Sequence, residues 1–358
     1  MEREGPMQFD GDLAYMLQAE HVAYYKDGVV SILDRRIYPV RVEYVRCKTH
    51  VEVRDALRNM VTQSAGPYTA AAMGMALAAH ESRHLKGEAR LRYLEEAAVV
   101  LASGRPTTAM RMAQVTRGAL AVAKDHLDDE DLDLILRDHA LHSMEKRYAT
   151  IHRVAKNFME LLPEEGTVMT QCFGETIIGM LAREIINSGR DIAFVCPETR
   201  PFLQGARFTA SVLSQMGMDT TVITDNMVAA YIENHGITLF TSAADSICMD
   251  GSIVNKVGTH QIAIVSAYFG VPYYATGIPD MDVKSAKDLT IEMRDPEESL
   301  SAHGIKHTVE GVKGYYPAFD VTPPNLVTGV VTDLGIFKST ELKEYEKKKG
   351  AGDFYFAV

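Results

Sequence analysis

Hydrophobic residues follow two different patterns along this 358-residue chain. Between about residues 51 and 160, apolar side chains recur at intervals of three and four, the spacing that gathers them on one face of an α-helix. The clearest such segments are residues 51–61, 70–82, 89–103 and 107–127. Before residue 50, apolar and polar residues alternate, which predicts a small antiparallel sheet. The N-terminal part is therefore predicted to be mostly helical, with a small sheet at its start.

From Gly166 onward, short and continuous apolar strands alternate with helical segments. The predicted strands are residues 167–172, 191–199, 219–226, 237–247 and 271–277. The predicted helices are residues 174–189, 201–217, 227–236 and 254–270. Continuous apolar strands are typical of a parallel sheet that helices cover on both faces. We therefore predict a doubly wound, Rossmann-like α/β domain with a mainly parallel sheet, and a domain division into residues 1–155 and 156–358.

Length and composition limit the classes of protein that the chain can belong to. A chain of this length favours two domains. The 37 Lys and Arg residues against 48 Asp and Glu residues give a net charge of −11. This acidic balance argues against a nucleic-acid partner, because binding phosphate backbones requires an excess of cations. No uncharged apolar run is long enough to span a membrane, and residues 1–12 lack the apolar core of a secretion signal.

The four cysteines are spread along the chain without any Cys-x-x-Cys pair. This spacing predicts reduced thiols in a cytoplasmic protein, and it makes a metal or redox site a poor prediction. Neither a GxGxxG nor a GxxxxGK[ST] segment follows any predicted strand. A nicotinamide cofactor or a nucleoside triphosphate is therefore unsupported, whereas a small anionic ligand remains open.

Candidate chemistry gathers where the predicted strands end, because parallel sheets bind ligands beyond the carboxyl ends of their strands. Cys172 closes a strand ahead of a helix, whose dipole would favour the thiolate. The alternative is a small buried hydrophobic residue. Asp245 follows a run with almost no polarity, so we expect a partly desolvated carboxyl group with a raised pKa, suited to acid–base chemistry. The alternative is a helix N-cap.

Several polar and cationic residues are placed to bind an anion in the same crevice. Asn255 and Lys256 are expected to open a helix, where an amide and an ammonium group suit a phosphate. The alternative is a capping turn with a solvated lysine. Arg200 and Gln204 fall in the first turn of another helix, and Arg105 precedes a helix-starting proline in the N-terminal part. Together these residues predict a cleft with one thiol, one carboxylate and several phosphate-binding groups.

Six segments in chain order resemble the motifs of methylthioribose-1-phosphate isomerases. They are SGRPT (103–107), ETRPFLQGARFTA (198–210), ITDNM (223–227), ADSI (244–247), NKVGT (255–259) and PAFDVTP (317–323). The resemblance covers about residues 35–340. The same superfamily includes ribose-1,5-bisphosphate isomerases and regulatory subunits of a translation-initiation exchange factor.

The resemblance implies an aldose–ketose isomerase that turns an aldose 1-phosphate into a ketose 1-phosphate without a metal or an organic cofactor. It places Cys172 and Asp245 at the catalytic positions. Substrate-binding positions fall on Arg105, Gln204, Asn255 and Lys256. As a hypothesis, Asp245 is the acid that opens the ring, and Cys172 moves a proton between C2 and C1. Hydride transfer remains open. The resemblance also implies a homodimer through the α/β domain.

Two departures from the family pattern affect the substrate pocket. The family's VRGAPAIG loop corresponds to residues 62–68, where its arginine is replaced by Gln63, followed by Ser64 and Ala65. The small residues that follow the family's cysteine are replaced by the segment 173–176, which adds an aromatic side chain and a carboxylate. The 5-substituent is thus open: 5-deoxyribose 1-phosphate and ribose 1,5-bisphosphate are alternatives. A non-catalytic sensing subunit is the other alternative, and it would be expected to lose the thiol or the carboxylate.

Overall fold

The computed structural model describes residues 9–104, 109–302 and 304–350. Its chain divides into two compact units between Thr150 and Ile151. This division falls within the long helix α6 (Leu132–Phe158). Among the described residues, no helix combines the length and the apolarity needed to cross a bilayer.

The first unit begins with the small antiparallel sheet that the sequence predicts. Its strands are β1 (Ala23–Lys26), β2 (Val29–Leu33) and β3 (Tyr44–Cys47), paired in that order. Asp27 and Gly28 connect β1 to β2, and both have positive φ angles of 48° and 75°. An Asp-Gly pair with this backbone matches the right-handed twist of a two-residue hairpin, which explains why the chain turns here.

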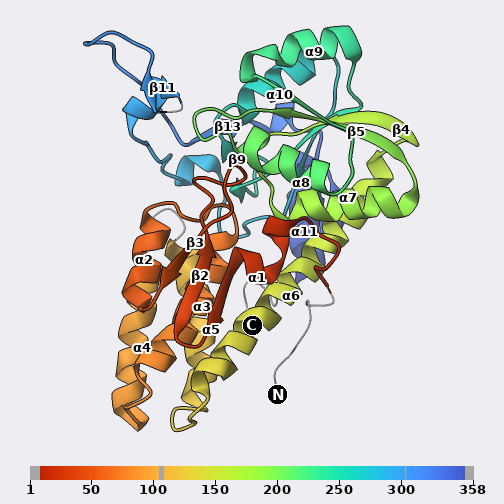
Figure 1. The fold of residues 1–358 in the computed structure, drawn as a ribbon. Coiled ribbons are helices and arrows are strands. Elements are labelled where there is room, and N and C mark those ends of the chain that lie inside the picture. Colours follow the sequence, from red (N-terminus) through yellow and green to blue (C-terminus); the bar gives the residue numbers. More distant parts are fainter. Residues whose placement is uncertain (1–8, 105–108, 303, 351–358) are drawn as a thin grey trace. The chain divides into compact units, whose positions relative to one another are not determined.

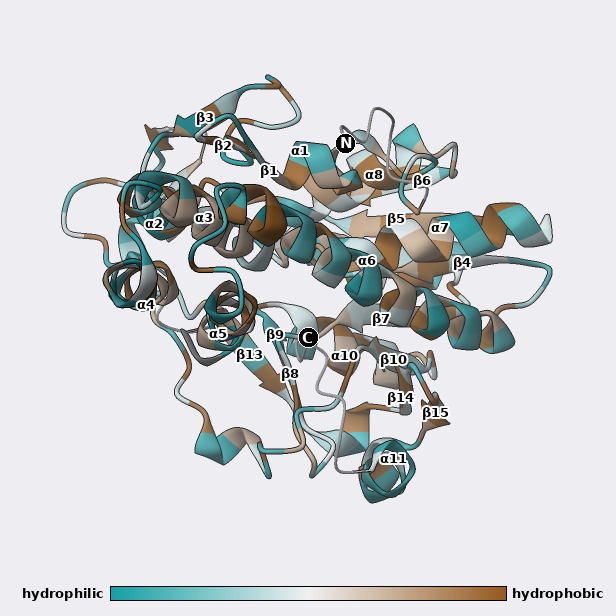
Figure 2. Ribbon diagram, turned by 90° about the horizontal axis from the view of Figure 1, so that it is seen from below, coloured by the Kyte–Doolittle hydropathy of each residue, from teal (hydrophilic) through white to brown (hydrophobic). Residues whose placement is uncertain are grey.

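Besides the short α1 (Ala19–Val22) and the start of α6, the described part of the first unit contains four helices. They are α2 (His50–Arg58), α3 (Gly66–Glu81), α4 (Gly87–Ala102) and α5 (Ala109–Lys124). Helix α3 is buried from Gly66 to Ala79, and it carries brown, hydrophobic segments in Figure 2. A side chain at Gly74 would contact Leu101 of α4 at 2.7 Å, so the glycine lets the two helices pack closely.

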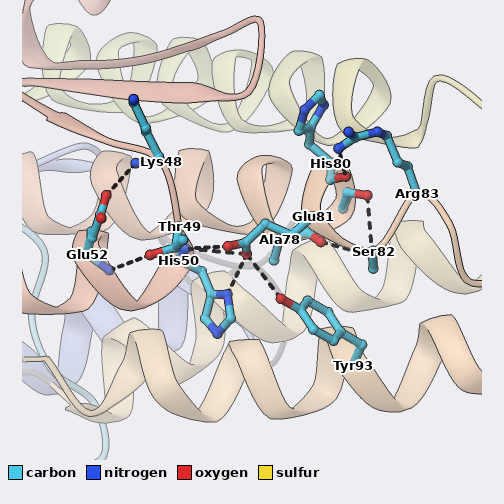
Figure 3. Close-up of polar contacts among 11 residues, drawn as sticks. Lys48, Thr49, His50, Glu52, Ala78, His80, Glu81, Ser82, Arg83 and Tyr93 are labelled. Carbon is cyan, nitrogen blue, oxygen red and sulfur yellow. Dashed lines mark hydrogen bonds and ion pairs between the residues drawn. The ribbon is translucent and has the colours of Figure 1, made fainter.

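Polar contacts fasten the start of α2 to its neighbouring helices (Figure 3). The hydroxyl of Thr49 caps α2 by accepting a hydrogen bond from the backbone N–H of Glu52 at 3.2 Å. The carboxylate of Glu81, at the end of α3, contacts His50 Nδ1 at 2.5 Å and accepts from the hydroxyl of Tyr93 in α4 at 3.4 Å. This cluster therefore joins three helices, and it has a structural role within the first unit.

A seven-stranded sheet forms the centre of the second unit (Figure 1). Its order is β15-β14-β10-β7-β4-β5-β6, and only β15 runs antiparallel to its neighbour. The strands are β4 (Glu165–Met169), β5 (Asp191–Pro197), β6 (Thr220–Ile223), β7 (Leu239–Ala243), β10 (Tyr273–Thr276), β14 (Gly329–Thr332) and β15 (Gly335–Phe337). The predicted mainly parallel sheet is confirmed.

The order of the strands shows where the winding of the chain reverses. From β4 the chain moves outward through β5 to β6, and it then returns to β7 on the other side of β4. Helices α7 (Thr176–Ser188) and α8 (Ala210–Gln215) pack together, as do α9 (Val228–His235) and α10 (Thr259–Tyr268). Because crossovers are right-handed, opposite winding directions place these two pairs on opposite faces. The switch point lies between β4 and β7.

Two predictions for the second unit are wrong in detail. The expected strand 237–247 ends at Ala243, and the chain turns before the short strand β8 (Ser246–Ile247). The expected helix 254–270 begins only at Thr259, because residues before it form β9 (Ile253–Lys256). Strand β9 pairs antiparallel with β8 and with β13 (Phe319–Thr322), and Gly258 has a φ of 103° where the strand gives way to the helix.

The segment between β10 and β13 carries little regular structure. It contains two short 3-10 helices (Ala286–Asp288 and Pro296–Ser299) and a hairpin of β11 (Ser301–Ala302) and β12 (Ile305–Lys306). Figure 1 shows this hairpin extending from the α/β unit. After β15, helix α11 (Leu342–Lys349) ends the described chain.

Candidate active site

Cys172 and Asp245 lie just beyond the carboxyl ends of the two strands that flank the switch point. Strand β4 ends three residues before Cys172, and β7 ends two residues before Asp245. The two strands are paired, with Met169 opposite Phe240. Ligands of doubly wound sheets bind at this place, because the flanking loops separate there and leave a crevice. The topology thus brings the two predicted reactive groups to one edge of the sheet.

The backbone of Cys172 is held by the neighbouring strand-end loops. Its N–H donates a hydrogen bond to the hydroxyl of Thr199 at 3.2 Å, and its carbonyl accepts one from the hydroxyl of Thr209. Its φ angle is 59°, in the left-handed region that non-glycine residues rarely adopt. The residue is only partly exposed. These contacts fix the position of the thiol between the loops after β4 and β5.

The thiol is not activated in the way that the sequence predicts. The pKa of Cys172 is raised to about 12, mainly by burial; the ammonium group of Lys256 lowers it, and the carboxylate of Asp245 contributes to the rise. Helix α7 begins at Thr176, so Cys172 lies in a loop four residues before the helix. The expected thiolate is therefore wrong, because the thiol is buried and lies outside the first turn of the helix.

Asp245 is exposed, contrary to the desolvation predicted for it. The preceding strand is buried, but it ends at Ala243, and the turn that follows carries the carboxylate outward. The backbone N–H of Asp245 donates to the carbonyl of Val254 at 3.0 Å. The alternative of a helix N-cap is also wrong, because a strand follows. Its carboxylate interacts electrostatically with both Cys172 and Lys256, which places the three groups in one neighbourhood.

Lys256 is a buried cation, so the alternative of a solvated lysine is wrong. Its side chain is 6% exposed, and its Nζ lies 4.9 Å from the ring centroid of Phe319 and 5.9 Å from that of Tyr316. The register explains the first contact, because Lys256 and Phe319 are directly opposite in the β9–β13 pair. Among the described residues, its ammonium group makes neither a hydrogen bond nor an ion pair. Burial lowers the pKa of Lys256, whereas Cys172 and Asp245 raise it.

Asn255 and Gln204 are both buried polar residues, the first in β9 and the second in the loop after β5. The amide of Asn255 donates to the hydroxyl of Thr259 at 3.0 Å, at the first residue of α10. Gln204 immediately precedes a π-helical turn, Gly205–Thr209. A side chain at Gly205 would lie 1.8 Å from the carbonyl oxygen of Pro197, so only glycine lets this turn pack against the end of β5.

Backbone strain is concentrated around this edge of the sheet. Seven described non-glycine residues have positive φ angles, and four of them lie in the loops after β4 and β5: Cys172, Glu175, Thr199 and Leu203. The side chain of Gln171 joins these loops to the start of α10, because it accepts from Thr199 at 3.3 Å and donates to the carbonyl of Val257 at 3.2 Å. Strained residues and π-helical turns recur at functional sites, so the local geometry supports one here.

The guanidinium of Arg200 binds backbone carbonyls, and its anion-binding role stays a prediction. Its guanidinium donates to the carbonyl oxygens of Ser301 at 2.7 Å and Glu298 at 3.4 Å, and so anchors the segment before β11. The backbone N–H of Arg200 donates to the carboxylate of Asp225 at 2.7 Å. A cavity of about 270 Å³ opens beside these loops. Its walls include Gln171, Arg200, Asp225, Val257, Gly258 and Asp320.

The segment 173–176 follows Cys172 and replaces small residues of the family pattern. Its side chains are largely buried. Phe173 is buried, and its ring lies 5.4 Å from that of Phe208, so this aromatic side chain packs inside the α/β unit. Glu175 is buried as well. The expectation that this segment adds an aromatic group to the pocket is therefore wrong, because the ring finds an apolar partner in the core.

The remaining predicted substrate-binding residues belong to the first unit. Gln63, Ser64 and Ala65 form the turn before α3, in which Gln63 is buried and Ser64 is exposed with a φ of 58°. Arg35 donates to the carbonyl of Gln63 at 2.7 Å, and Arg147 donates to that of Ala65 at 3.4 Å. These two cations hold the turn within its own unit. Arg105 lies outside the described residues.

Two residues of the site escape the sequence analysis. Tyr316 and Phe319 enclose Lys256, although only the PAFDVTP segment gave any reason to consider Phe319. The signal that finds Phe319 is the antiparallel pairing of β9 with β13, which requires recognising β9 as a strand; Tyr316 lies three residues before β13. In the part of the chain that the structure describes, no three His, Cys, Asp or Glu side chains are grouped to hold a metal ion.

The fold and this site define an α/β protein of the class whose ligand site lies at the switch point of a doubly wound sheet. The model of the initiation factor 2 subunit family matches residues 62–339. A methylthioribose-1-phosphate isomerase of Thermoanaerobacter sp. (strain X514) is 33% identical over 328 residues, 88% of this chain and 94% of that protein. A 5-deoxyribose 1-phosphate isomerase of Clostridium botulinum is 33% identical over 335 residues, with coverages of 88% and 95%.

Solved structures agree with these relatives. The 5-methylthioribose 1-phosphate isomerase of Pyrococcus horikoshii OT3 superimposes with a TM-score of 0.81 at 28% identity, and the match covers 96% of this chain and 99% of the other. A structure from A. fulgidus described as translation initiation factor eIF-2B, subunit delta, gives a TM-score of 0.78 at 28% identity, covering 92% and 98%. The chain therefore belongs to the initiation factor 2 subunit family, and the resemblance in its motifs to methylthioribose-1-phosphate isomerases is confirmed.

Proposed function

We propose that this protein is an aldose–ketose isomerase that converts a 5-substituted ribose 1-phosphate into the corresponding ribulose 1-phosphate. The observation that carries the proposal is the meeting of Cys172, Asp245 and the buried Lys256 at the switch point of the sheet. Methylthioribose 1-phosphate is the first candidate substrate, since relatives of this chain are named for it. The Clostridium botulinum relative makes 5-deoxyribose 1-phosphate the second candidate.

Asp245 is proposed as the acid that opens the ring. Its carboxyl group gives a proton to the ring oxygen as the bond from that oxygen to C1 breaks, which leaves positive charge at C1. Cys172 then takes the proton from C2, and an enol forms across C1 and C2. The proton returns from Cys172 to C1, and the C2 hydroxyl gives its proton to the Asp245 carboxylate as the ketone forms. All atoms of the substrate are retained, and both side chains return to their starting states.

The raised pKa of Cys172 constrains this mechanism. At neutral pH the free protein holds a thiol, so the thiol is proposed to give its proton to the Asp245 carboxylate after substrate binds, which supplies both the thiolate and the acid. Lys256 favours the thiolate, because its ammonium group lowers the pKa of Cys172. A proton carried by the thiol predicts that turnover in D₂O introduces deuterium at C1, which proton NMR of the product measures. Complete retention of protium at C1 contradicts the proton shuttle and supports a direct hydride shift.

Substrate binding is assigned to the polar groups around the reactive pair. We propose that Lys256, Asn255 and Gln204 bind phosphate or hydroxyl oxygens, because all three are buried polar side chains and Lys256 interacts electrostatically with the reactive pair. Arg105 and the turn Gln63–Ala65 are proposed to bind substrate as well, on the basis of the motif resemblance. Loss of the family's arginine at Gln63 is expected to change preference among 5-substituents.

Turnover by the purified protein tests the proposal. The panel is methylthioribose 1-phosphate, 5-deoxyribose 1-phosphate and ribose 1,5-bisphosphate, with ketose formation as the readout. We expect Cys172→Ala and Asp245→Asn to abolish turnover while leaving the unfolding transition intact. Cys196→Ala is the matched control, because this fully buried thiol of β5 has no proposed role. Binding without turnover on the whole panel overturns the isomerase and supports a sensing subunit.

A further inference from the structure

The hydroxyl of Tyr316 is a buried polar group without a hydrogen-bond partner among the described residues. Tyr316 lies three residues before β13 and is 3% exposed. Its carbonyl accepts a hydrogen bond from the backbone N–H of Arg294 at 2.9 Å, so its backbone is fixed. Its hydroxyl makes no hydrogen bond within the described chain. Leaving a buried hydroxyl unpaired costs free energy, and such exceptions call for a reason.

Tyr316 lies in the candidate active site. Its ring centroid is 5.9 Å from Nζ of Lys256, and its ring is 6.4 Å from that of Phe202. The phenol interacts electrostatically with the Cys172 thiol, with Arg294 and with the carboxylates of Glu298 and Glu292. Burial is the largest cause that raises the pKa of Tyr316. The group therefore stays protonated, and it is available as a hydrogen-bond donor throughout the neutral pH range.

Two polar groups thus meet at this place without partners among the described residues. One is the ammonium group of Lys256, and the other is the hydroxyl of Tyr316. A cation beside a neutral donor is complementary to an anionic or partly charged oxygen. The two groups belong to different segments of the chain, so their coincidence is not a consequence of one local turn.

We infer that Tyr316 is a further substrate-binding residue, whose hydroxyl donates a hydrogen bond to the substrate oxygen that Lys256 binds. This inference rests on the proposed function, since it concerns the same site. A bound substrate oxygen would satisfy this hydroxyl, which accounts for its lack of a partner among the described residues. The aromatic ring has a separate role, because it packs beside Lys256 whether or not the hydroxyl is there.

Tyr316→Phe separates the two roles, because it removes the hydroxyl and keeps the ring. We expect the dissociation constant for methylthioribose 1-phosphate to rise about 10- to 100-fold, the effect of losing a hydrogen bond to a charged group. It is measured by calorimetry on Asp245→Asn protein, in which turnover is blocked. The unfolding midpoint of the free protein should stay equal or rise, because a buried unpaired hydroxyl is lost.

Tyr345→Phe is the matched control. Its hydroxyl is also buried, but it donates to Asp333 at 3.1 Å within the second unit. This variant should lower the unfolding midpoint and leave the dissociation constant unchanged. If Tyr316→Phe instead behaves like the control, its hydroxyl has a structural role, and the inference is overturned.

A double-variant cycle with Lys256→Met tests whether the two groups share one oxygen. Groups that bind the same atom are coupled, so the combined loss of affinity should be smaller than the product of the single losses. A combined loss equal to that product overturns the shared oxygen. If wild type turns substrate over while Tyr316→Phe binds it normally, this inference alone fails. If wild type neither binds nor converts any sugar phosphate of the panel, both proposals fail.

Discussion

The protonation state of Cys172 gives the sharpest test of the electrostatics at the switch point. Its pKa is raised from an ordinary value of 9.0 to about 12 by burial. At pH 8 this leaves a thiolate fraction of about 1 in 10,000, against about 1 in 10 for an ordinary cysteine. Alkylation by iodoacetamide requires the thiolate. We therefore expect Cys172 to react about 1,000-fold more slowly at pH 8 than an exposed cysteine, before any steric effect.

Two variants shift this rate in opposite directions. Asp245→Asn removes the carboxylate that raises the pKa of the thiol, so alkylation at pH 8 should become faster. Lys256→Met removes the cation that lowers this pKa, so alkylation should become slower. Far below its pKa, each unit by which the pKa moves changes the rate about tenfold. The rate is followed from pH 7 to pH 11 by mass spectrometry of the peptide that contains Cys172.

The other cysteines do not obscure the measurement. Cys47, Cys196 and Cys248 are all buried, and burial raises the pKa of each to about 11. An inflection at or below pH 9 in the wild-type protein would refute the reasoning, because it means that the loop stabilises the thiolate after all. Equal shifts in the same direction for both variants would contradict the opposing effects of the carboxylate and the ammonium group.

Three further predictions concern stability. Above pH 9 the unfolded chain releases the Cys172 proton while the folded chain keeps it. The free energy of unfolding should therefore fall by about 1.4 kcal/mol between pH 8 and pH 10 because of this thiol. Urea titrations of Cys172→Ala should lack that part of the decline. Gly205→Ala forces a methyl group to within 1.8 Å of the Pro197 carbonyl, so we expect a loss of about 2–3 kcal/mol in urea unfolding together with loss of turnover. In the native protein Lys349 lies 2.8 Å from the carboxylate of Asp333, and Asp333→Ala removes this partner. We expect the free energy of unfolding to fall by about 3 kcal/mol while kcat stays unchanged. A changed kcat would contradict a purely structural role.

Much of the secondary structure of the α/β unit can be predicted from the sequence, because its strands can be recognised from their own residues. Mainly apolar runs identify β4, β5, β7 and β10, since strands covered on both faces carry few charged positions. Strand β9 escapes this reasoning. Its residues Ile253–Lys256 lead directly into α10, and their polar members pair with a strand more than 60 residues further along. The apolar pattern of residues 254–270 is typical of a single helix. Only the pairing of β9 with β13 shows that a strand ends before α10 begins.

The candidate site can likewise be predicted only in part from the sequence. The rule that ligands bind at strand ends selects Cys172 and Asp245 without any structure. Their adjacency depends on the strand order, which places β7 beside β4, and local patterns do not contain that order. The contacts of each side chain are harder to predict from the sequence. Arg200 binds carbonyls about 100 residues away, and Lys256 is enclosed by rings about 60 residues away.

The enclosure of Lys256 by Phe319 and Tyr316 has a consequence for the energetics of any anion that binds there. Lys256 loses most of its contact with water when the chain folds, so most of the cost of dehydrating it falls on the stability of the fold and not on the affinity for a ligand. Ring faces attract a cation but, unlike carboxylates, they do not compete with an incoming anion for its charge. Because the cation is 6% exposed, dissolved salt screens it poorly. The affinity for an anion at this site should therefore depend only weakly on ionic strength, because the cation is already buried before the anion binds.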